Sequence, residues 1–390
     1  MGNFLNSRER VNTALNHTEP DKIPIDLGGN QSGIHIKAYI RLLDYLDIKD
    51  ANIQYYDFVQ QLAVPCEELL ERFQVDTRYV RPLGGMIRVN DVKPQYEGKY
   101  VGSYDQFGCF WGNNAEKEVS DILYYDPVIH PLAEFNSVEE IKDYDWPNGK
   151  DLEPFKGLKE YACNLRGKTN YALITPPTGC VYEYTTFLFG FTKALRYLRT
   201  KPELLKAAME ELLAYWIDYN ITFLNEVGEY LDVVCINGDL AEQAGPIMNP
   251  RIYENMIKPI ERKLSDKIHE LADVKINYHC CGSVPMFINH WIDIKYDAFN
   301  PVQISAYDME PCSLKKRFGN MIAFWGGACN TQSTLPFGTP EKIRDEVRYN
   351  LECFKPGGGY IAANIHNITA EVPPQNIVAM FDAINEFRSY

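Results

Sequence analysis

Strand-like and helical segments alternate almost without interruption from about residue 170 to the end of this 390-residue chain. Short hydrophobic runs predict strands at 171–175, 231–236, 274–278, 298–303, 321–325 and 359–363. The intervening helices are predicted at about 203–223, 250–272, 284–292, 340–354 and 374–388. Alternation of this kind indicates parallel strands joined by right-handed crossovers, with the helices outside the sheet.

The helix at 203–223 has the clearest periodicity of the series. Its apolar side chains recur every three or four residues, at Leu205, Met209, Leu212, Leu213, Trp216 and Ile217. This spacing places them on one face of a helix, which predicts that the face packs against the sheet.

Two further strands can be placed before residue 170, at 23–27 and 76–80. With them the chain supplies eight strands. We therefore predict an α/β protein of the (β/α)8 TIM-barrel class, with an N-terminal helical segment and all of residues 1–390 in one domain. An open doubly wound sheet is the alternative, but no Gly-x-Gly-x-x-Gly motif follows the first strand.

Residues 84–130 have a different pattern. Short alternating runs separated by turn residues predict a β-hairpin insertion, as the pattern is typical of antiparallel strands. Inserted after an early barrel strand, it is expected to cover the mouth of the barrel. Its many aromatic side chains either wall a pocket there or pack onto the barrel.

The composition excludes several classes of partner. A net charge of −14 argues against binding to nucleic acid or to an anionic membrane, both of which favour clustered lysine and arginine. The first residues lack the apolar core of a signal peptide, and no stretch is long enough to span a membrane. We therefore expect a cytoplasmic protein whose ten cysteines are mostly buried, reduced thiols.

His279 and Cys281 close the hydrophobic run at 274–278. Because side chains alternate along a strand, these two lie on the same side, and Gly282 lets the backbone turn away. Imidazole and thiolate are common zinc ligands, and barrel active sites lie at the carboxyl ends of the strands. The pair therefore predicts a catalytic zinc site, with a structural role for so short a motif as the alternative.

Cys329 lies near the end of the next strand but one and is the predicted third ligand. Two thiolates and one imidazole balance the charge of Zn²⁺ and leave a fourth position open. A small buried thiol is the alternative for Cys329. Asp239, Glu242 and His366, at other strand ends, are the alternative ligands or the groups that orient His279. Asp239 and His366 are also the candidates for catalytic roles.

Other polar side chains follow the predicted strands at the same edge of the sheet. Those expected to bind substrate are Asn30 and His35 after the first strand, Asn237 after the strand at 231–236, and Gln303 at the end of the strand at 298–303. Unpaired polar groups are costly to bury, so their convergence favours a binding site over core filling.

Several motifs together resemble the uroporphyrinogen decarboxylase superfamily over nearly the whole chain. They are Arg8-Glu9-Arg10-Val11, Pro20-Asp21-Lys22-Ile23-Pro24, His279-x-Cys281-Gly282-Ser283, Asn300-Pro301-Val302-Gln303, Gly326 to Gln332, Leu335 to Pro340, Pro356 to Tyr360 and Val372 to Ile377. The resemblance implies a barrel fold. It also places Asp76 roughly where the decarboxylase has a central aspartate, which makes Asp76 a further expected substrate-binding residue.

Within that superfamily the chain is more similar to the cobalamin-dependent methyltransferases. The decarboxylase binds the carboxylates of its porphyrinogen with arginines after the first strand, and residues 24–40 contain none. The methyltransferases carry a zinc-binding His-x-Cys, as here. Those acting on coenzyme M have a late cysteine where this chain has Gly357–Gly359, so the resemblance favours enzymes that demethylate donors such as methoxylated aromatics.

That resemblance implies Zn²⁺ and a cobalamin carried by a partner corrinoid protein, because the chain lacks the Asp-x-His-x-x-Gly cobalamin motif. The small-molecule methyl donor would bind in the barrel mouth. Two alternatives are a related enzyme with other chemistry, such as thiol methylation or decarboxylation of a smaller acid, and a metal-free binding protein. A homo-oligomer is left open.

Overall fold

A curled parallel sheet forms the centre of the computed structural model, which describes residues 4–82 and 94–390. Its seven strands lie in the order β15-β14-β13-β12-β9-β8-β3. They are β3 (Thr77–Tyr79), β8 (Ala172–Cys180), β9 (Val233–Asn237), β12 (Lys275–His279), β13 (Ala298–Asn300), β14 (Ala323–Trp325) and β15 (Tyr360–Ile361). All six neighbouring pairs are parallel, as the alternating sequence pattern predicts.

The segment at 23–27 occupies the gap between the two edge strands. Ile25 pairs in parallel with Ala362 beside β15, and the Ile25 carbonyl accepts from the amide of Asp76 beside β3. The sheet thereby closes into a barrel of eight positions. The predicted (β/α)8 class is confirmed, although the first position is a bridge rather than a full strand.

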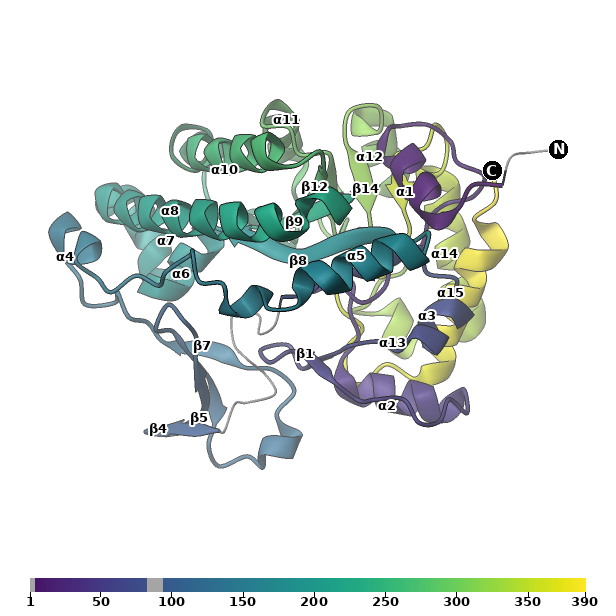
Figure 1. Cartoon of the computed structure of the whole chain (residues 1–390), viewed down its shortest axis with the longest axis horizontal. Coiled ribbons are helices and arrows are strands. Elements are labelled where there is room, and N and C mark those ends of the chain that lie inside the picture. The colour runs from purple at the N-terminus through teal and green to yellow at the C-terminus, as the bar shows by residue number, and fades with distance from the viewer. Residues whose placement is uncertain (1–3, 83–93) are drawn as a thin grey trace.

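Helices cover the outside of the sheet (Figure 1). After α1 (Ser7–Leu15), the larger helices are α2 (Ile36–Tyr45), α3 (Glu67–Arg72), α5 (Leu158–Lys168), α6 (Tyr182–Phe189), α7 (Phe191–Thr200), α8 (Pro202–Val227), α10 (Lys258–Leu271), α11 (Pro285–Asp293), α12 (Pro311–Phe318), α14 (Pro340–Phe354) and α15 (Pro374–Phe387). Shorter ones are α4 (Val138–Lys142), α9 (Pro250–Ile252) and α13 (Thr334–Phe337). Among the described residues, none is both long and apolar enough to cross a bilayer.

The barrel interior is filled by small and apolar side chains from alternate strand positions. Those buried there include Ala172, Ile174, Val233, Cys235, Ala298, Ala323, Trp325 and Ile361, with Val11 and Leu15 of α1 below them. A second, larger core lies between the sheet and the helices. The barrel is therefore packed, and its chemistry must lie at the ends of the strands.

Asp26 ties several strands together inside the barrel. Its carboxylate accepts from the Thr77 hydroxyl at 2.5 Å, the Ser32 hydroxyl at 2.6 Å and the Trp325 indole at 2.9 Å. The Tyr79 hydroxyl donates to it at 3.0 Å. Four donors satisfy a carboxylate that is fully buried, so its burial is compensated by hydrogen bonds.

The predicted insertion is β-rich over its described part. β4 (Gln95–Glu97), β5 (Tyr100–Tyr104), β6 (Phe110–Asn114) and β7 (Asp126–Ile129) form an antiparallel sheet that projects at the lower left of Figure 1. Asp105 links this sheet to α6, because the Asp105 side chain accepts from the Trp111 indole on β6 at 2.6 Å and from the Tyr184 hydroxyl on α6. Residues 84–93 of the predicted insertion lie outside the described residues.

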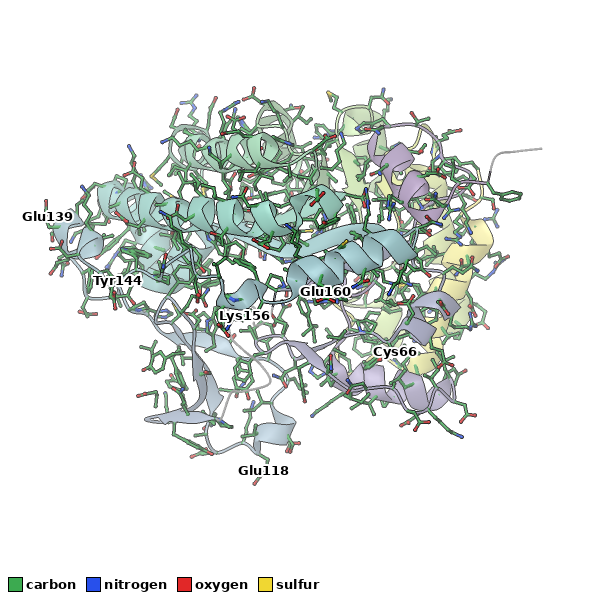
Figure 2. The ribbon with its side chains drawn as sticks, in the orientation of Figure 1. Cys66, Glu118, Glu139, Tyr144, Lys156 and Glu160 are labelled. Atoms are coloured by element: carbon green, nitrogen blue, oxygen red, sulfur yellow. A yellow bond between two sulfur atoms is a disulfide. The ribbon has the colours of Figure 1, made fainter. Side chains whose placement is uncertain are left out.

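The acidic net charge is displayed on the surface. Glu118 after the insertion's third strand, Glu139 on α4 and Glu160 on α5 are all exposed (Figure 2). The cysteines are expected to be mostly reduced, yet Cys312 and Cys353 form a disulfide between α12 and α14. The other cysteines are free.

Candidate metal centre

Three groups that can bind a metal converge at the carboxyl ends of β12 and β15. One ligand atom each from His279, Cys281 and His366 can be chosen so that all three lie within 4.8 Å of one another. Nε2 of His279 is 3.4 Å from Sγ of Cys281, and the two imidazole rings have centroids 5.4 Å apart. The His279-x-Cys281 pair therefore has a third metal-binding group beside it, and that group is His366 rather than the expected Cys329.

Asn300 determines how the His279 ring is presented. Nδ1 of His279 lies 2.8 Å from Oδ1 of Asn300, whose amide nitrogen in turn donates to the Trp325 carbonyl at 3.2 Å. An amide oxygen can only accept, so Nδ1 carries the proton and Nε2 keeps its lone pair facing Cys281. Metal-bound histidines are usually held by such a contact at the second nitrogen.

The chain turns sharply after this pair. The Cys281 amide donates to Oδ1 of Asp239 at 2.7 Å, and the Gly282 amide donates to Oε1 of Gln303 at 2.8 Å. Gly282 has φ +87°, and a Cβ there would lie 2.6 Å from the Glu242 carbonyl. Only glycine fits that position, which explains why the motif ends in glycine.

Burial keeps the three groups neutral. It lowers the pKa of His279 to about 4, opposed by the Asn300 contact, and lowers that of His366 to about 4, with help from His279. Burial first, and then Asp239, raises the pKa of the Cys281 thiol well above its ordinary value. Two neutral imidazoles are ready to bind a cation, and the thiol becomes a ligand once the cation displaces its proton.

Glu183 is a residue of this site that the sequence analysis missed. It lies in the first turn of α6, where Oε2 accepts from the Cys180 thiol at 3.3 Å. Burial and the neighbouring Asp239 raise the pKa of Glu183 to about 8, and burial also raises the pKa of Asp239. The strand is predicted at 171–175, whereas β8 runs on to Cys180, so the sequence does not show that Glu183 lies just beyond a strand end.

The insertion and β1 (Tyr55–Asp57) add groups at the edge of this cluster. Tyr124, shortly before β7, is 46% exposed, yet Asp57 and Glu183 lie close enough to raise the pKa of its phenol further than burial alone. Burial raises the pKa of Asp57 to about 6. The acidic part of the site therefore extends from Asp239 through Glu183 toward Asp57.

Cys329 does not join the group, which corrects the predicted third ligand. It is fully buried, and its thiol lies against Glu346 of α14; burial and that carboxylate raise its pKa well above the ordinary value. The cause is local. Gly326 and Gly327 have φ +118° and +68°, so the chain leaves the strand after Trp325 and the alternation of side chains no longer holds at residue 329.

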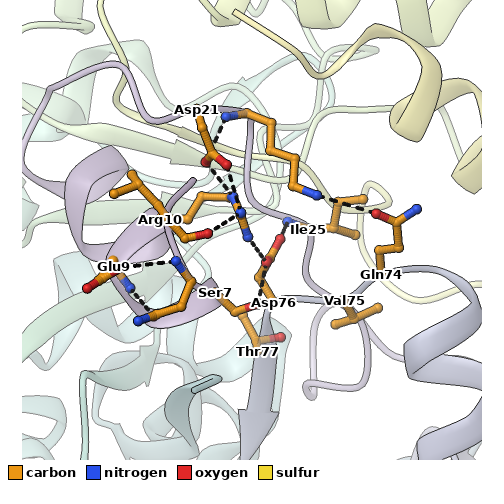
Figure 3. Close-up of polar contacts among 12 residues, drawn as sticks. Ser7, Glu9, Arg10, Asp21, Ile25, Gln74, Val75, Asp76 and Thr77 are labelled. Atoms are coloured by element: carbon orange, nitrogen blue, oxygen red, sulfur yellow. Dashed lines mark hydrogen bonds and ion pairs between the residues drawn. The ribbon is translucent and has the colours of Figure 1, made fainter. Parts of the chain in front are cut away.

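Asp76 also lies elsewhere than predicted. It directly precedes β3, at the amino end of the strand, and accepts from Arg10 at 2.6 Å, from the Ser7 hydroxyl at 2.7 Å and from the Ile25 amide at 2.9 Å (Figure 3). Arg388 is 3.5 Å from Oδ2, the oxygen that also accepts from the Ile25 amide. Asp76 is therefore a structural anchor at the closed end of the barrel rather than a substrate-binding residue.

His35 has a structural role as well. Its Nδ1 accepts from the Lys37 amide at 3.1 Å and so caps α2, and its Nε2 lies 3.3 Å from the Leu123 carbonyl. Both ring nitrogens are occupied in a side chain that is 5% exposed. The predicted role of His35 in substrate binding is therefore not supported by its position.

The remaining predicted residues lie at the mouth. Asn237 stands beside His279 in the parallel register, and its Oδ1 accepts from Nε2 of Gln31 at 2.6 Å. Gln303 is engaged with the Gly282 amide. Asn30 contributes its backbone carbonyl, which accepts from the Asn367 amide group at 2.8 Å. These contacts shape the loops around the metal-binding group.

Fold and site together define an α/β-barrel protein with a His-Cys-His cluster and a neighbouring pair of carboxyl groups, Glu183 and Asp239, at the carboxyl ends of its strands. The chain matches the family model described as uroporphyrinogen decarboxylase (URO-D) over residues 127–387. The protein belongs to this family.

Individual relatives agree with that assignment. A uroporphyrinogen decarboxylase from Pseudoalteromonas translucida is 25% identical over 206 residues, which cover 51% of this chain and 52% of that protein. One from Methylococcus capsulatus is 29% identical over 97 residues, 25% of this chain and 27% of that protein. The chain thus spans about half the length, or less, of the curated relatives it matches.

A solved structure shares the fold over almost the whole chain. It is a methyltransferase from Methanosarcina mazei, with a TM-score of 0.63 and 17% identity, covering 98% of this chain and 99% of that one. At this level of identity the likeness establishes the barrel architecture but not the reaction.

Proposed function

We propose that this protein is a zinc-dependent methyltransferase. It would remove the methyl group of a small methylated donor, a methoxylated aromatic, and deliver it to the cobalamin of a partner corrinoid protein. The metal would be held by His279, Cys281 and His366. This ligand set keeps the His-x-Cys pair expected from the sequence and replaces Cys329 by His366.

The observation that carries the proposal is the convergence of two imidazoles and one thiol at the end of the barrel where substrates bind. Nitrogen and sulfur donors suit Zn²⁺, and three protein ligands leave a fourth position for substrate, as in catalytic zinc sites. The Asn300 contact already selects the tautomer of His279 that leaves Nε2 free for a metal. The residues present therefore fit the ion.

Zn²⁺ bound there would supply a Lewis acid for the ether oxygen, and the reduced corrinoid would supply the nucleophile for the methyl group. The protein must stabilise the oxygen that departs with the bonding electrons, since an ether is a poor leaving group. Glu183, next to Asp239, is the side chain placed to hold a proton at neutral pH and give it to that oxygen.

Decarboxylation of a porphyrinogen is less well supported, although several similar proteins are uroporphyrinogen decarboxylases. Residues 24–40 carry no arginine, and Asp76 is turned toward Arg10 at the opposite end of the barrel. The arginines expected of a porphyrinogen site are thus missing from this segment, and Asp76 lies away from the substrate-binding end of the barrel.

The test is a methyl-transfer assay with anaerobically purified, zinc-loaded protein. A methoxylated benzene and free cob(I)alamin are mixed, and the loss of cob(I)alamin absorbance is compared with the release of phenol. Cys281→Ala should abolish both signals, whereas Cys163→Ala, which changes an exposed free thiol, should leave them unchanged. Equal rates with and without the protein across a series of donors would refute the proposal.

A further inference from the structure

Arg81 lies at the carboxyl end of β3, on the same end of the barrel as the metal-binding group. Its Nη2 donates to the Gly28 carbonyl at 2.6 Å. Its guanidinium carbon lies 4.7 Å from the ring centre of Tyr56 and 5.1 Å from that of Tyr79. Two aromatic rings and one carbonyl thus hold the guanidinium in a fixed orientation.

Arg81 is partly buried and lacks the carboxylate partner that the buried arginines have. Arg10 pairs with Asp76 at 2.6 Å and Arg78 pairs with Glu67. Across residues 4–82 and 94–390, by contrast, no carboxylate lies within ion-pair distance of Arg81, and its Nε is buried without a hydrogen-bond partner. Burying a cation without a counter-charge is unfavourable, so the arrangement is suited to an anion supplied from outside.

The direction in which the pKa of Arg81 shifts is consistent with the lack of a carboxylate partner. Burial lowers it, and the groups that oppose the shift most strongly are the phenols of Tyr56 and Tyr79 rather than a carboxylate. Asp26 lies farther off and is already occupied by four donors. Among the residues that the structure describes, no acid therefore pairs with the guanidinium.

The loop that Arg81 holds also reaches the metal-binding group. The Gly28 amide donates to the Ser32 carbonyl, and within that turn Gln31 donates to Asn237 at 2.6 Å. Asn237 is aligned with His279 on the next strand. β3 and β12 are separated by two strands, which corresponds to about 14 Å along the sheet. An arginine side chain and a substrate with one aromatic ring can bridge this span across the mouth.

We propose that Arg81 binds the carboxylate of the methyl donor, so that the substrate is a methoxylated aromatic acid rather than a neutral ether. This rests on the proposed function for the identity of the reacting group. The guanidinium presents parallel N–H donors to the two oxygens of a carboxylate, which both pairs the charge and orients the ring. The methoxy group at the other end of the ring would then face His279 and Cys281.

Calorimetric binding to the zinc-loaded protein tests the inference without any methyl transfer. 4-Methoxybenzoate is compared with 4-methoxybenzamide, which has the same shape and no charge. The wild-type protein should bind the acid at least about tenfold more tightly, as one charge-assisted pair contributes roughly 1.5–3 kcal/mol. Arg81→Gln should remove the preference and leave the amide affinity within about twofold, whereas the exposed Arg251→Gln should retain it.

Equal binding of acid and amide by the wild-type protein would overturn the inference whether or not Arg81→Gln folds. A parallel fall in both affinities for a folded Arg81→Gln would also overturn it, because Arg81 would then only support the loop at Gly28. Acid preference in a protein that transfers no methyl group would uphold the carboxylate site and refute the proposed function. Demethylation of neutral ethers by a protein that shows no preference for the acid would uphold the proposed function and refute the carboxylate site.

Discussion

Nδ1 of His279 lies 2.8 Å from the side-chain oxygen of Asn300, and this contact leaves Nε2 facing the Cys281 thiol at 3.4 Å. The two residues stand level with each other on neighbouring parallel strands, β12 and β13. A register set by backbone hydrogen bonds therefore fixes the orientation of the predicted metal ligand. The sheet positions the ligand, and Asn300 selects the nitrogen that it presents.

The Asn300 contact predicts a measurable effect on metal affinity. Asn300→Ala should weaken zinc binding by about 10- to 100-fold, because the His279 ring loses the acceptor that fixes its tautomer. Competition with a chromophoric chelator at pH 7.5 measures this. Asn148→Ala, an exposed site on a loop, is the control. An unchanged zinc affinity in Asn300→Ala would mean that His279 is not a ligand through Nε2.

Metal content distinguishes the two candidate third ligands. Wild-type protein should hold about one zinc per chain, and Cys281→Ala and His366→Ala should lose it. Cys329→Ala should keep it, since that thiol lies in the core against Glu346. Elemental analysis of the three variants beside the wild type decides the matter. Loss of zinc in Cys329→Ala, in a protein with unchanged circular dichroism, would restore the ligand set expected from the sequence.

The barrel and the edge that carries the site could be predicted because both follow from local patterns. Hydrophobic runs mark the strands, and the polar residues that end them mark the carboxyl edge, as His279 and Asn237 show. Asp76, by contrast, is expected at the substrate-binding edge, and the structure shows that expectation to be wrong. Because Asp76 precedes its strand, the direction of the chain alone assigns it to the amino end of the barrel.

The third ligand could not be predicted in the same way. Alternation along a strand holds only while the strand continues, and Gly326 turns the chain before Cys329 is reached. His366 follows β15 in a left-handed conformation with φ +60°, which no periodicity reveals. Its proximity to Cys281 depends on closure of the barrel, a property of the whole chain rather than of any segment.

The contacts of Asp76 predict that replacing this residue lowers the stability of the fold and leaves the metal centre unchanged. Asp76→Ala leaves Arg10 and Arg388 without their shared buried carboxylate, which should cost about 3–5 kcal/mol of the free energy of unfolding. Zinc stoichiometry should stay unchanged. Chemical denaturation measures the difference, with Glu386→Ala as the control because its pair with Arg344 is half exposed on both sides.

A small effect of Asp76→Ala on stability together with a loss of substrate binding would contradict this assignment. It would place Asp76 in the substrate site, as the superfamily resemblance first implied. Normal stability with normal substrate binding would show instead that the hydrogen bonds from Ser7 and the Ile25 amide to Asp76 do not stabilise the fold.

Glu183 gives the metal-free protein a distinctive dependence on pH. Burial and Asp239 raise its pKa to about 8, above the ordinary 4.5, so the folded protein holds the proton more tightly than the unfolded chain does. The stabilisation this gives is complete below pH 4.5 and is lost as the pH rises through 8. His279 and His366, with pKa values lowered to about 4, change stability only below about pH 6.5, where the unfolded chain takes up protons.

Between pH 6.5 and 8 the Glu183 effect should therefore stand alone among these groups. At about 1.4 kcal/mol per pH unit, wild-type protein should lose roughly 2 kcal/mol relative to Glu183→Gln across this window. Urea denaturation of metal-free protein at several pH values measures the difference, with the exposed Glu160→Gln as the control. A constant difference between wild type and Glu183→Gln would show that Glu183 is ionised throughout. It could then not hold the proton that the departing oxygen needs.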